Sequence, residues 1–122
     1  MAKILVVDDS QVIRDLLTDF LGELGHLVDL AVDGVEGLEK ARCGDYDLCI
    51  CDLHLPRMNG YQLLTELGAD RDRMQFIFTD SLPDDLYEQV KASTSHQCIR
   101  KPFDLAQFRQ VVERALDRVK SA

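Results

Sequence analysis

The chain has 122 residues, of which 46% are hydrophobic and 30% are charged, and its formal net charge is −8. This length and composition predict one globular domain with a single core, and they exclude a disordered or fibrous protein. The negative charge argues against direct binding to nucleic acid or to an anionic membrane surface, because such binding depends on Lys and Arg.

The beginning of the chain predicts a buried strand followed by an amphipathic helix. Residues 4–7 are apolar without polar alternation, which is typical of a strand covered on both faces, and the run stops at Asp8 and Asp9. Ser10 can cap a helix whose apolar side chains recur every three or four residues until Gly25. The apolar positions of this helix are Val12, Ile13, Leu16, Leu17, Phe20, Leu21 and Leu24.

A second strand and helix follow. Residues 27–31 predict a short strand. Asp33, with Glu36 three residues later, forms the capping-box pattern of a helix start. We expect this helix to end near Gly44.

The second half of the chain repeats this alternation. Residues 48–51 are again an apolar run, and they end in the carboxylate of Asp52. Asn59 and Gly60 mark a loop before a short helix, and residues 75–79 predict a fourth strand. The remaining expected elements are a helix from Pro83, a short strand at residues 98–99 before Lys101, and an amphipathic helix over residues 105–119.

Five alternating strand–helix units predict an α/β fold, a three-layer, doubly wound parallel sheet. In such a sheet, polar side chains at the carboxyl ends of the strands lie along one edge, where ligands bind. The residues at or just past these ends are Asp8, Asp9, Asp52, Thr79 and Lys101. We therefore expect these residues, which are far apart in sequence, to meet in space.

This set of residues predicts a particular chemistry. Carboxylates that converge repel one another unless a cation neutralises them, and Mg²⁺ often combines one or two carboxylates with water and phosphate oxygens. Asp8, Asp9 and Asp52 therefore predict a magnesium site that is open to phosphate. Asp52 can then act as a nucleophile toward phosphorus, while Lys101 neutralises phosphoryl charge and Thr79 donates a hydrogen bond.

These segments resemble the receiver domain of bacterial two-component response regulators, and the resemblance covers essentially the whole chain. The matching motifs are residues 4–9, residues 52–60, Thr79 and Lys101-Pro102-Phe103. The resemblance implies the flavodoxin-like strand order 2-1-3-4-5, which is that of the chemotaxis member of this family.

The resemblance also implies a function. Asp52 would accept a phosphoryl group from a sensor histidine kinase or a histidine phosphotransfer protein, Lys101 would contact that group, and Thr79 would move toward it. The implied magnesium ligands are Asp9, Asp52 and the backbone carbonyl of His54, with Asp8 acting partly through water. The face of helix four, strand five and helix five would then meet a downstream output protein or domain, or a second copy of the chain. Such a domain catalyses only its own phosphorylation and dephosphorylation, so we do not expect an enzyme in the wider sense.

Three positions depart from the pattern of the family or tune it. Asp80 stands where a small residue usually follows the switch Thr, and its charge is expected to lie beside the path of the phosphoryl group. Cys98 stands where an aromatic switch residue is usual. His54 occupies a variable position of the loop after Asp52, and we expect its side chain to face solvent.

Three other functions share part of this sequence pattern. An aspartate-nucleophile phosphatase needs a second Asp two residues after the nucleophile, where this chain has His54. A flavodoxin-like FMN binder would place phosphate at Asp8 and Asp9, which would repel it. A degenerate receiver that binds partners without being phosphorylated stays open, and Asp80 and Cys98 are the residues that favour it.

The sequence also predicts where the protein is located and the state of its cysteines. No apolar run reaches the roughly 18 residues of a membrane span, and the first residues do not form a signal peptide, so we expect a single domain over residues 1–122 in the cytoplasm. It would be either a stand-alone receiver or part of a longer protein. The four cysteines lack disulfide or zinc spacing and are expected to be buried, reduced thiols: Cys43, Cys49, Cys51 and Cys98.

Overall fold

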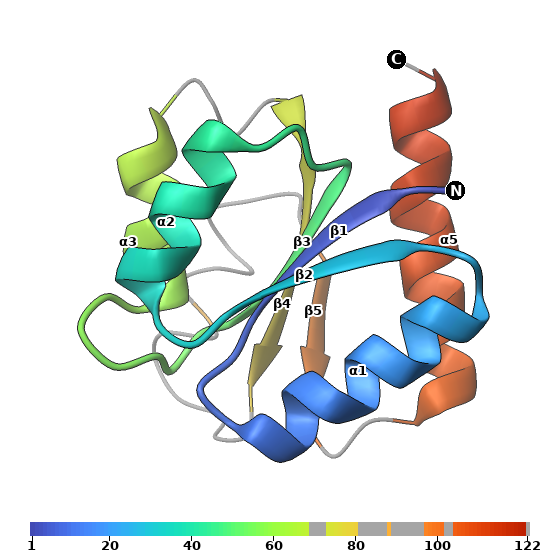
Figure 1. The fold of residues 1–122 in the computed structure, drawn as a ribbon, viewed down its shortest axis with the longest axis horizontal. Coiled ribbons are helices and arrows are strands. Elements are labelled where there is room, and N and C mark those ends of the chain that lie inside the picture. Colours follow the sequence, from blue (N-terminus) through green and yellow to red (C-terminus); the bar gives the residue numbers. More distant parts are fainter. Residues whose placement is uncertain (69–72, 81–87, 89–96, 102–103, 122) are drawn as a thin grey trace.

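The protein is built on one five-stranded parallel sheet (Figure 1). A computed structural model describes residues 1–68, 73–80, 88, 97–101 and 104–121. The strand order is β2-β1-β3-β4-β5, and each neighbouring pair is parallel, which confirms the predicted fold. The strands are β1 (Lys3–Val7), β2 (Leu27–Ala31), β3 (Leu48–Asp52), β4 (Gln75–Asp80) and β5 (Gln97–Arg100).

Helices cover both faces of the sheet and complete the predicted three layers. In Figure 1, α2 and α3 lie on one side of the sheet and α1 and α5 on the other. The helices are α1 (Gln11–Glu23), α2 (Gly34–Cys43), α3 (Gly60–Leu67) and α5 (Leu105–Ser121). The helix expected from Pro83 lies outside the described residues.

The helix starts follow from local side-chain chemistry. Ser10 Oγ accepts from the N–H of Ile13 (3.4 Å) at the start of α1. Asp33 caps α2 in the same way, through the N–H of Glu36 (2.8 Å). Asn59 begins α3 as the N-cap of a capping box. Each cap satisfies a backbone donor that the first turn of a helix leaves without an intrahelical partner, so the predicted starts are confirmed.

The core lies in two parts because the central strands are apolar on both faces. Leu5 and Val7 of β1 belong to the part under α2 and α3, while Ile4 and Val6 belong to the part under α1 and α5. Successive strand residues point to opposite faces, so one short apolar run supplies both parts.

The predicted apolar face of α1 is only partly buried. Leu17 and Leu21 are buried, but Val12 is 75% exposed and Leu16 is 38% exposed. Val12 and Leu16 each precede an inward-facing position by one residue, which turns them about 100° around the helix axis. The predicted amphipathic helix is present, but these two apolar side chains lie beside its buried face.

The free thiols likewise divide between core and surface. Cys49 and Cys51 of β3 are buried, and Cys98 is half-buried against the core under α2 and α3. Cys43, at the last position of α2, is exposed, so the expectation of burial is wrong there.

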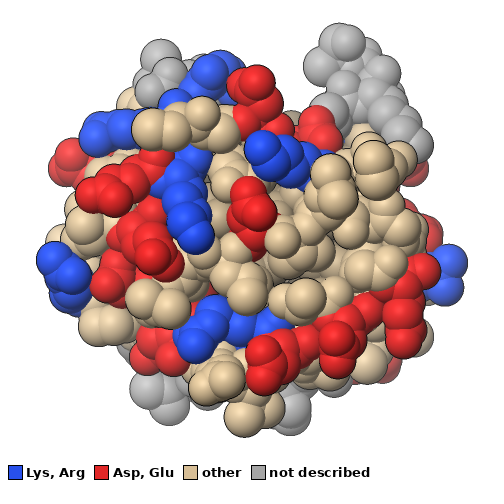
Figure 2. Space-filling view, viewed as in Figure 1, with Lys and Arg blue, Asp and Glu red and all other residues tan. Residues whose placement is uncertain are grey.

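The molecular surface carries both signs of charge. On the face seen in Figure 2, Lys and Arg side chains are interspersed with Asp and Glu, and no continuous basic patch forms on this view of the described residues. Among those residues, no helix has both the length and the apolar character needed to cross a membrane.

Candidate functional site

The carboxyl ends of the strands bring polar side chains to one edge of the sheet. β3 ends at Asp52 and β4 ends at Asp80, while Asp8 and Lys101 follow β1 and β5 directly. Within the described residues, the buried polar or charged side chains are Asp8, Asp52, Thr79 and Asp80. All four lie at this carboxyl edge, so the predicted meeting of residues from distant parts of the chain takes place.

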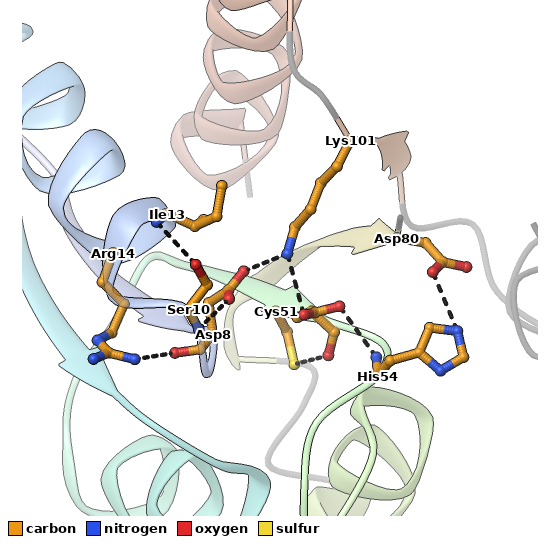
Figure 3. A network of polar contacts seen from close by, with 9 residues as sticks. Asp8, Ser10, Ile13, Arg14, Cys51, His54, Asp80 and Lys101 are labelled. Carbon is orange, nitrogen blue, oxygen red and sulfur yellow. Dashed lines mark hydrogen bonds and ion pairs between the residues drawn. The ribbon is translucent and has the colours of Figure 1, made fainter. Parts of the chain in front are cut away.

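Asp52 has a donor on each carboxylate oxygen. Lys101 Nζ donates to Asp52 Oδ2 (3.1 Å), and the backbone N–H of His54 donates to Asp52 Oδ1 (3.1 Å) (Figure 3). These two bonds fix the orientation of the carboxylate at the end of the central strand.

Asp8 is held in a similar way from the neighbouring strand. Its Oδ2 accepts from Lys101 Nζ (2.8 Å), and its Oδ1 accepts from the backbone N–H of Ser10 (2.9 Å). Arg14 Nη1 donates to the Asp8 carbonyl (2.8 Å), a contact that the sequence did not suggest. Lys101 therefore bridges Asp8 and Asp52, and Asp8 is also tied to the start of α1.

A third carboxylate completes an acidic cluster. Carboxylate oxygens of Asp8, Asp9 and Asp52 all lie within 4.8 Å of one another, with Asp9 exposed and the other two buried. Three carboxylates against the ammonium group of Lys101 leave two negative charges, which a divalent cation would neutralise. An all-oxygen set with one side open to water suits Mg²⁺, which keeps several waters and takes phosphate oxygens as further ligands.

The titration behaviour of the cluster points the same way. Burial raises the pKa of Asp52; the charge of Lys101 lowers it, the charge of Asp8 raises it, and the pKa stays above its ordinary value. Burial lowers the pKa of Lys101, but its contacts with Asp8 and Asp52 together outweigh burial and raise that pKa. Both shifts favour the bound proton, as expected where buried carboxylates crowd one ammonium group.

Gly60 allows the loop after Asp52 to close tightly. Its N–H donates to the Leu53 carbonyl (3.0 Å), and a Cβ at this position would lie 2.8 Å from the Asp52 carbonyl oxygen. The start of α3 thus rests directly on the backbone that carries Asp52. This close approach explains why the segment from 52 to 60 ends in glycine.

Thr79 and His54 both lie next to Asp52 at the carboxyl edge. Thr79 is buried beside Asp52 across the β3–β4 pairing, and its carbonyl accepts from the N–H of Leu53 (2.9 Å). The side chain of His54 is 33% exposed, and its Nε2 lies 3.1 Å from Asp80 Oδ1. The expectation that His54 faces solvent is therefore wrong, because the buried Asp80 carboxylate turns its ring inward.

The two remaining residues of the lysine motif, Pro102 and Phe103, lie outside the described residues. Lys101 itself is described, and its backbone N–H donates to the Asp80 carbonyl (2.7 Å). This bond fixes the point from which the lysine side chain reaches Asp8 and Asp52.

Comparison with known families agrees with this geometry. Residues 4–113 match the response regulator receiver domain. The chain belongs to this family. The receiver is a signalling domain of response regulators, so the match favours this function over the phosphatase and FMN-binding alternatives.

Individual relatives place the receiver within longer proteins. Regulator of RpoS from Escherichia coli (strain K12) is 32% identical over 112 residues, which is 90% of this chain and 33% of the relative. The chain thus spans about a third of the length of this curated relative.

Two solved structures match the receiver over nearly their whole length. A CheY-like receiver domain protein from Methanospirillum hungatei JF-1 has a TM-score of 0.90 at 26% identity, with 99% of this chain and 98% of that chain covered. The response regulator TrrA from Thermotoga maritima, solved in complex with Mg²⁺ and BeF, has a TM-score of 0.85 at 29% identity, with 95% and 100% covered. Receiver domains bind Mg²⁺ at an acidic pocket, and the acidic cluster at the carboxyl edge is the matching feature of this receiver.

Proposed function

We propose that this receiver accepts a phosphoryl group on Asp52 in a magnesium-dependent reaction. The observation that carries the proposal is the pairing of Asp52 with Lys101 inside a cluster of three carboxylates at the open edge of the sheet. The donor would be a phosphohistidine on a sensor histidine kinase or a histidine phosphotransfer protein.

In the proposed reaction, a carboxylate oxygen of Asp52 attacks phosphorus. A bond forms between this oxygen and phosphorus, the bond between phosphorus and the donor imidazole nitrogen breaks, and the leaving imidazole takes up a proton from solvent. The barrier is lowered mainly by position and by neutralised charge, since phosphoryl transfer needs little covalent assistance. Hydrolysis removes the phosphoryl group: water attacks phosphorus, the bond to the Asp52 oxygen breaks, and inorganic phosphate and the Asp52 carboxylate are released.

Each neighbouring residue has a role in this proposal. Lys101 Nζ pairs with phosphoryl oxygens as it now pairs with Asp52, and the Thr79 hydroxyl donates a hydrogen bond to the same group. Bound Mg²⁺ would neutralise further phosphoryl charge. Its proposed ligands are Asp9, Asp52 and the His54 carbonyl, with Asp8 acting through water.

The engaged oxygens of Asp8 support this division between the two adjacent carboxylates. Both Asp8 oxygens already accept hydrogen bonds, one from Lys101 and one from Ser10. Asp9 is the exposed member of the cluster, so its carboxylate can meet a metal ion that keeps water ligands.

The proposed output follows from the place of Thr79 in the sheet. β4 pairs with β5 and contacts α5, so a shift of Thr79 toward the phosphoryl group would act on both elements. We propose that the face made by the helix expected from Pro83 together with β5 and α5 meets an output protein or domain or a second copy of the chain, in the cytoplasm. Residues 1–122 would act as one receiver domain.

The proposal is tested by phosphorylation with acetyl phosphate and Mg²⁺, followed by intact mass measurement. Wild type should gain one phosphoryl group, Asp52→Asn should gain none, and EDTA should prevent the gain. Asp45→Asn is the matched control, because it removes the same charge from an exposed loop position before β3 and should label as wild type does.

Two results would contradict the proposal. Undiminished labelling of Asp52→Asn would place the phosphoryl group elsewhere. A wild type that takes up no phosphoryl group from acetyl phosphate or from any histidine phosphodonor would favour a phosphorylation-independent interaction module.

A further inference from the structure

One contact at the carboxyl edge joins two side chains to which the proposed phosphoryl chemistry gives no role. Asp80 is 1% exposed at the end of β4, and its Oδ1 lies 3.1 Å from Nε2 of His54, which belongs to the loop after β3 (Figure 3). Nε2 is buried, and its distance from Oδ1 is that of an ion pair. A buried carboxylate attracts a polar partner at this distance, since a buried charge without one is costly.

His54 connects this contact to the phospho-acceptor. The same residue donates its backbone N–H to Asp52 Oδ1 (3.1 Å). Its side chain and its backbone therefore act at two places: the ring is anchored on Asp80, and the N–H orients Asp52.

Asp80 is connected to Asp52 by a second route as well. Its carbonyl accepts from the backbone N–H of Lys101 (2.7 Å), and Lys101 Nζ donates to Asp52 Oδ2 (3.1 Å). Both donors that hold the two oxygens of Asp52 are thus attached to the same residue at the end of β4. Any residue at position 80 can supply the carbonyl, but only a side-chain acceptor can hold His54.

We propose that the His54–Asp80 contact positions the phospho-acceptor, with Asp80 as the anchor and His54 as the link to Asp52. The inference rests on the proposed function, because it names residues that set the rate of the same reaction. It also reverses the expectation drawn from the sequence. A carboxylate directed at His54 would speed phosphorylation by ordering Asp52, whereas a carboxylate directed at the incoming phosphoryl group would slow it.

The test is a double-mutant cycle in the full chain, with acetyl phosphate and Mg²⁺ as the phosphodonor. The variants are His54→Ala, Asp80→Ala and the double variant, together with His54→Gln and Asp80→Asn, which keep a donor and an acceptor respectively. Labelling rates are measured over a range of acetyl phosphate concentrations, so that the saturating rate and the half-saturating concentration are obtained separately. Asp45→Asn serves as the charge-matched control, and thermal unfolding shows which variants are folded.

Each alanine variant should lower the saturating rate by about fivefold, the effect expected for the loss of one polar contact, with little change in the half-saturating concentration. The double variant should be no slower than either single variant, because both remove the same contact. His54→Gln and Asp80→Asn should recover the rate to within about twofold of wild type. If Asp80→Ala does not fold, His54→Ala and His54→Gln carry the test, since His54 is partly exposed.

Three results would overturn the proposal. Faster labelling of Asp80→Ala than of wild type would mean that its charge repels the phosphoryl group. Losses that multiply in the double variant, or conservative variants as slow as the alanine variants, would mean that the two residues do not act through their contact. Normal labelling of wild type with any of these results would leave the proposed function standing, whereas an unlabelled wild type would overturn both.

Discussion

The two ends of the sheet treat charged side chains differently. Away from the carboxyl edge, two carboxylates have a donor of their own: Asp47 Oδ2, just before β3, accepts from the backbone N–H of Lys3 (2.9 Å), and Asp29 Oδ2, in the middle of β2, accepts from the hydroxyl of Tyr46 (2.7 Å). Lys3 Nζ also lies 4.9 Å from the centre of the Tyr46 ring, a cation–π contact. We call Lys3, Asp29, Tyr46 and Asp47 the amino-end cluster.

At the carboxyl edge the charges do not balance. Asp8, Asp9 and Asp52 crowd within 4.8 Å, and Lys101 is shared between two of them. Like charges held together by a fold reduce its stability, so such an arrangement is a mark of function. In this protein, a group of acidic residues therefore marks a functional site where nearby cations do not balance its charge.

The largest expected effect comes from removing the shared lysine. Lys101→Met should lower the labelling rate with acetyl phosphate by about 100-fold, as does the loss of one group that stabilises transition-state charge. Lys3→Met removes the same charge from the amino-end cluster and should label within about twofold of wild type. Equal losses in the two variants, measured by intact mass against time, would erase the distinction between the two ends.

The next effect concerns magnesium. Asp9→Ala should weaken Mg²⁺ binding by about tenfold or more, and Asp8→Ala by less, because the loss of a direct ligand exceeds that of an outer contact. Asp47→Ala, in the amino-end cluster, should bind as wild type does. Calorimetric titration of the three variants would contradict this order if both Asp8→Ala and Asp9→Ala retained wild-type affinity.

The smallest effect is on stability at the other end of the sheet. Burial, followed by the hydrogen bond and charge of Asp29, raises the pKa of Tyr46 above its ordinary value of about 10. The unfolded state therefore loses this proton first, so the contribution of Tyr46 is full below pH of about 10 and falls as the pH rises beyond it. Tyr46→Phe should cost about 1 kcal/mol at neutral pH and should reduce the alkaline loss.

Denaturant unfolding from pH 7 to pH 11 checks this prediction, with acetyl phosphate labelling as the companion measurement. Labelling at neutral pH should be unchanged in Tyr46→Phe. A variant that is as stable as wild type but slow to label would assign the amino-end cluster a part in the chemistry and contradict this prediction.

Much of the fold could be predicted because local patterns and global topology agree. The apolar runs before Asp8 and Asp52 have no polar alternation, which is the pattern of strands between two helix layers, and caps such as Ser10 and Asp33 mark the helix starts. The exposure of Val12 could not be predicted. The spacing of apolar residues shows which side chains can be buried, but the packing of the helix on the sheet decides which of them are buried.

The residues of the site could be predicted from the sequence, but the contacts between them could not. A strand end places Asp52 and Lys101 at one edge, yet nothing in the sequence shows that a single ammonium group bridges Asp8 and Asp52. The expected strand ended at residue 79, whereas β4 continues to Asp80 and buries its side chain. That one extra strand residue brings Asp80 against His54, and only the pairing register reveals it.

The central claim is that Asp52 is the phospho-acceptor of the carboxyl edge, and chemical trapping tests it most directly. Borohydride reduces an aspartyl phosphate to homoserine and leaves free carboxylates unchanged, so peptide mass spectrometry after labelling identifies the acceptor itself. The account predicts homoserine at position 52 alone, formed only when Mg²⁺ and acetyl phosphate are both present. Homoserine at position 8, 9 or 80, or the same yield at position 52 without Mg²⁺, would contradict it.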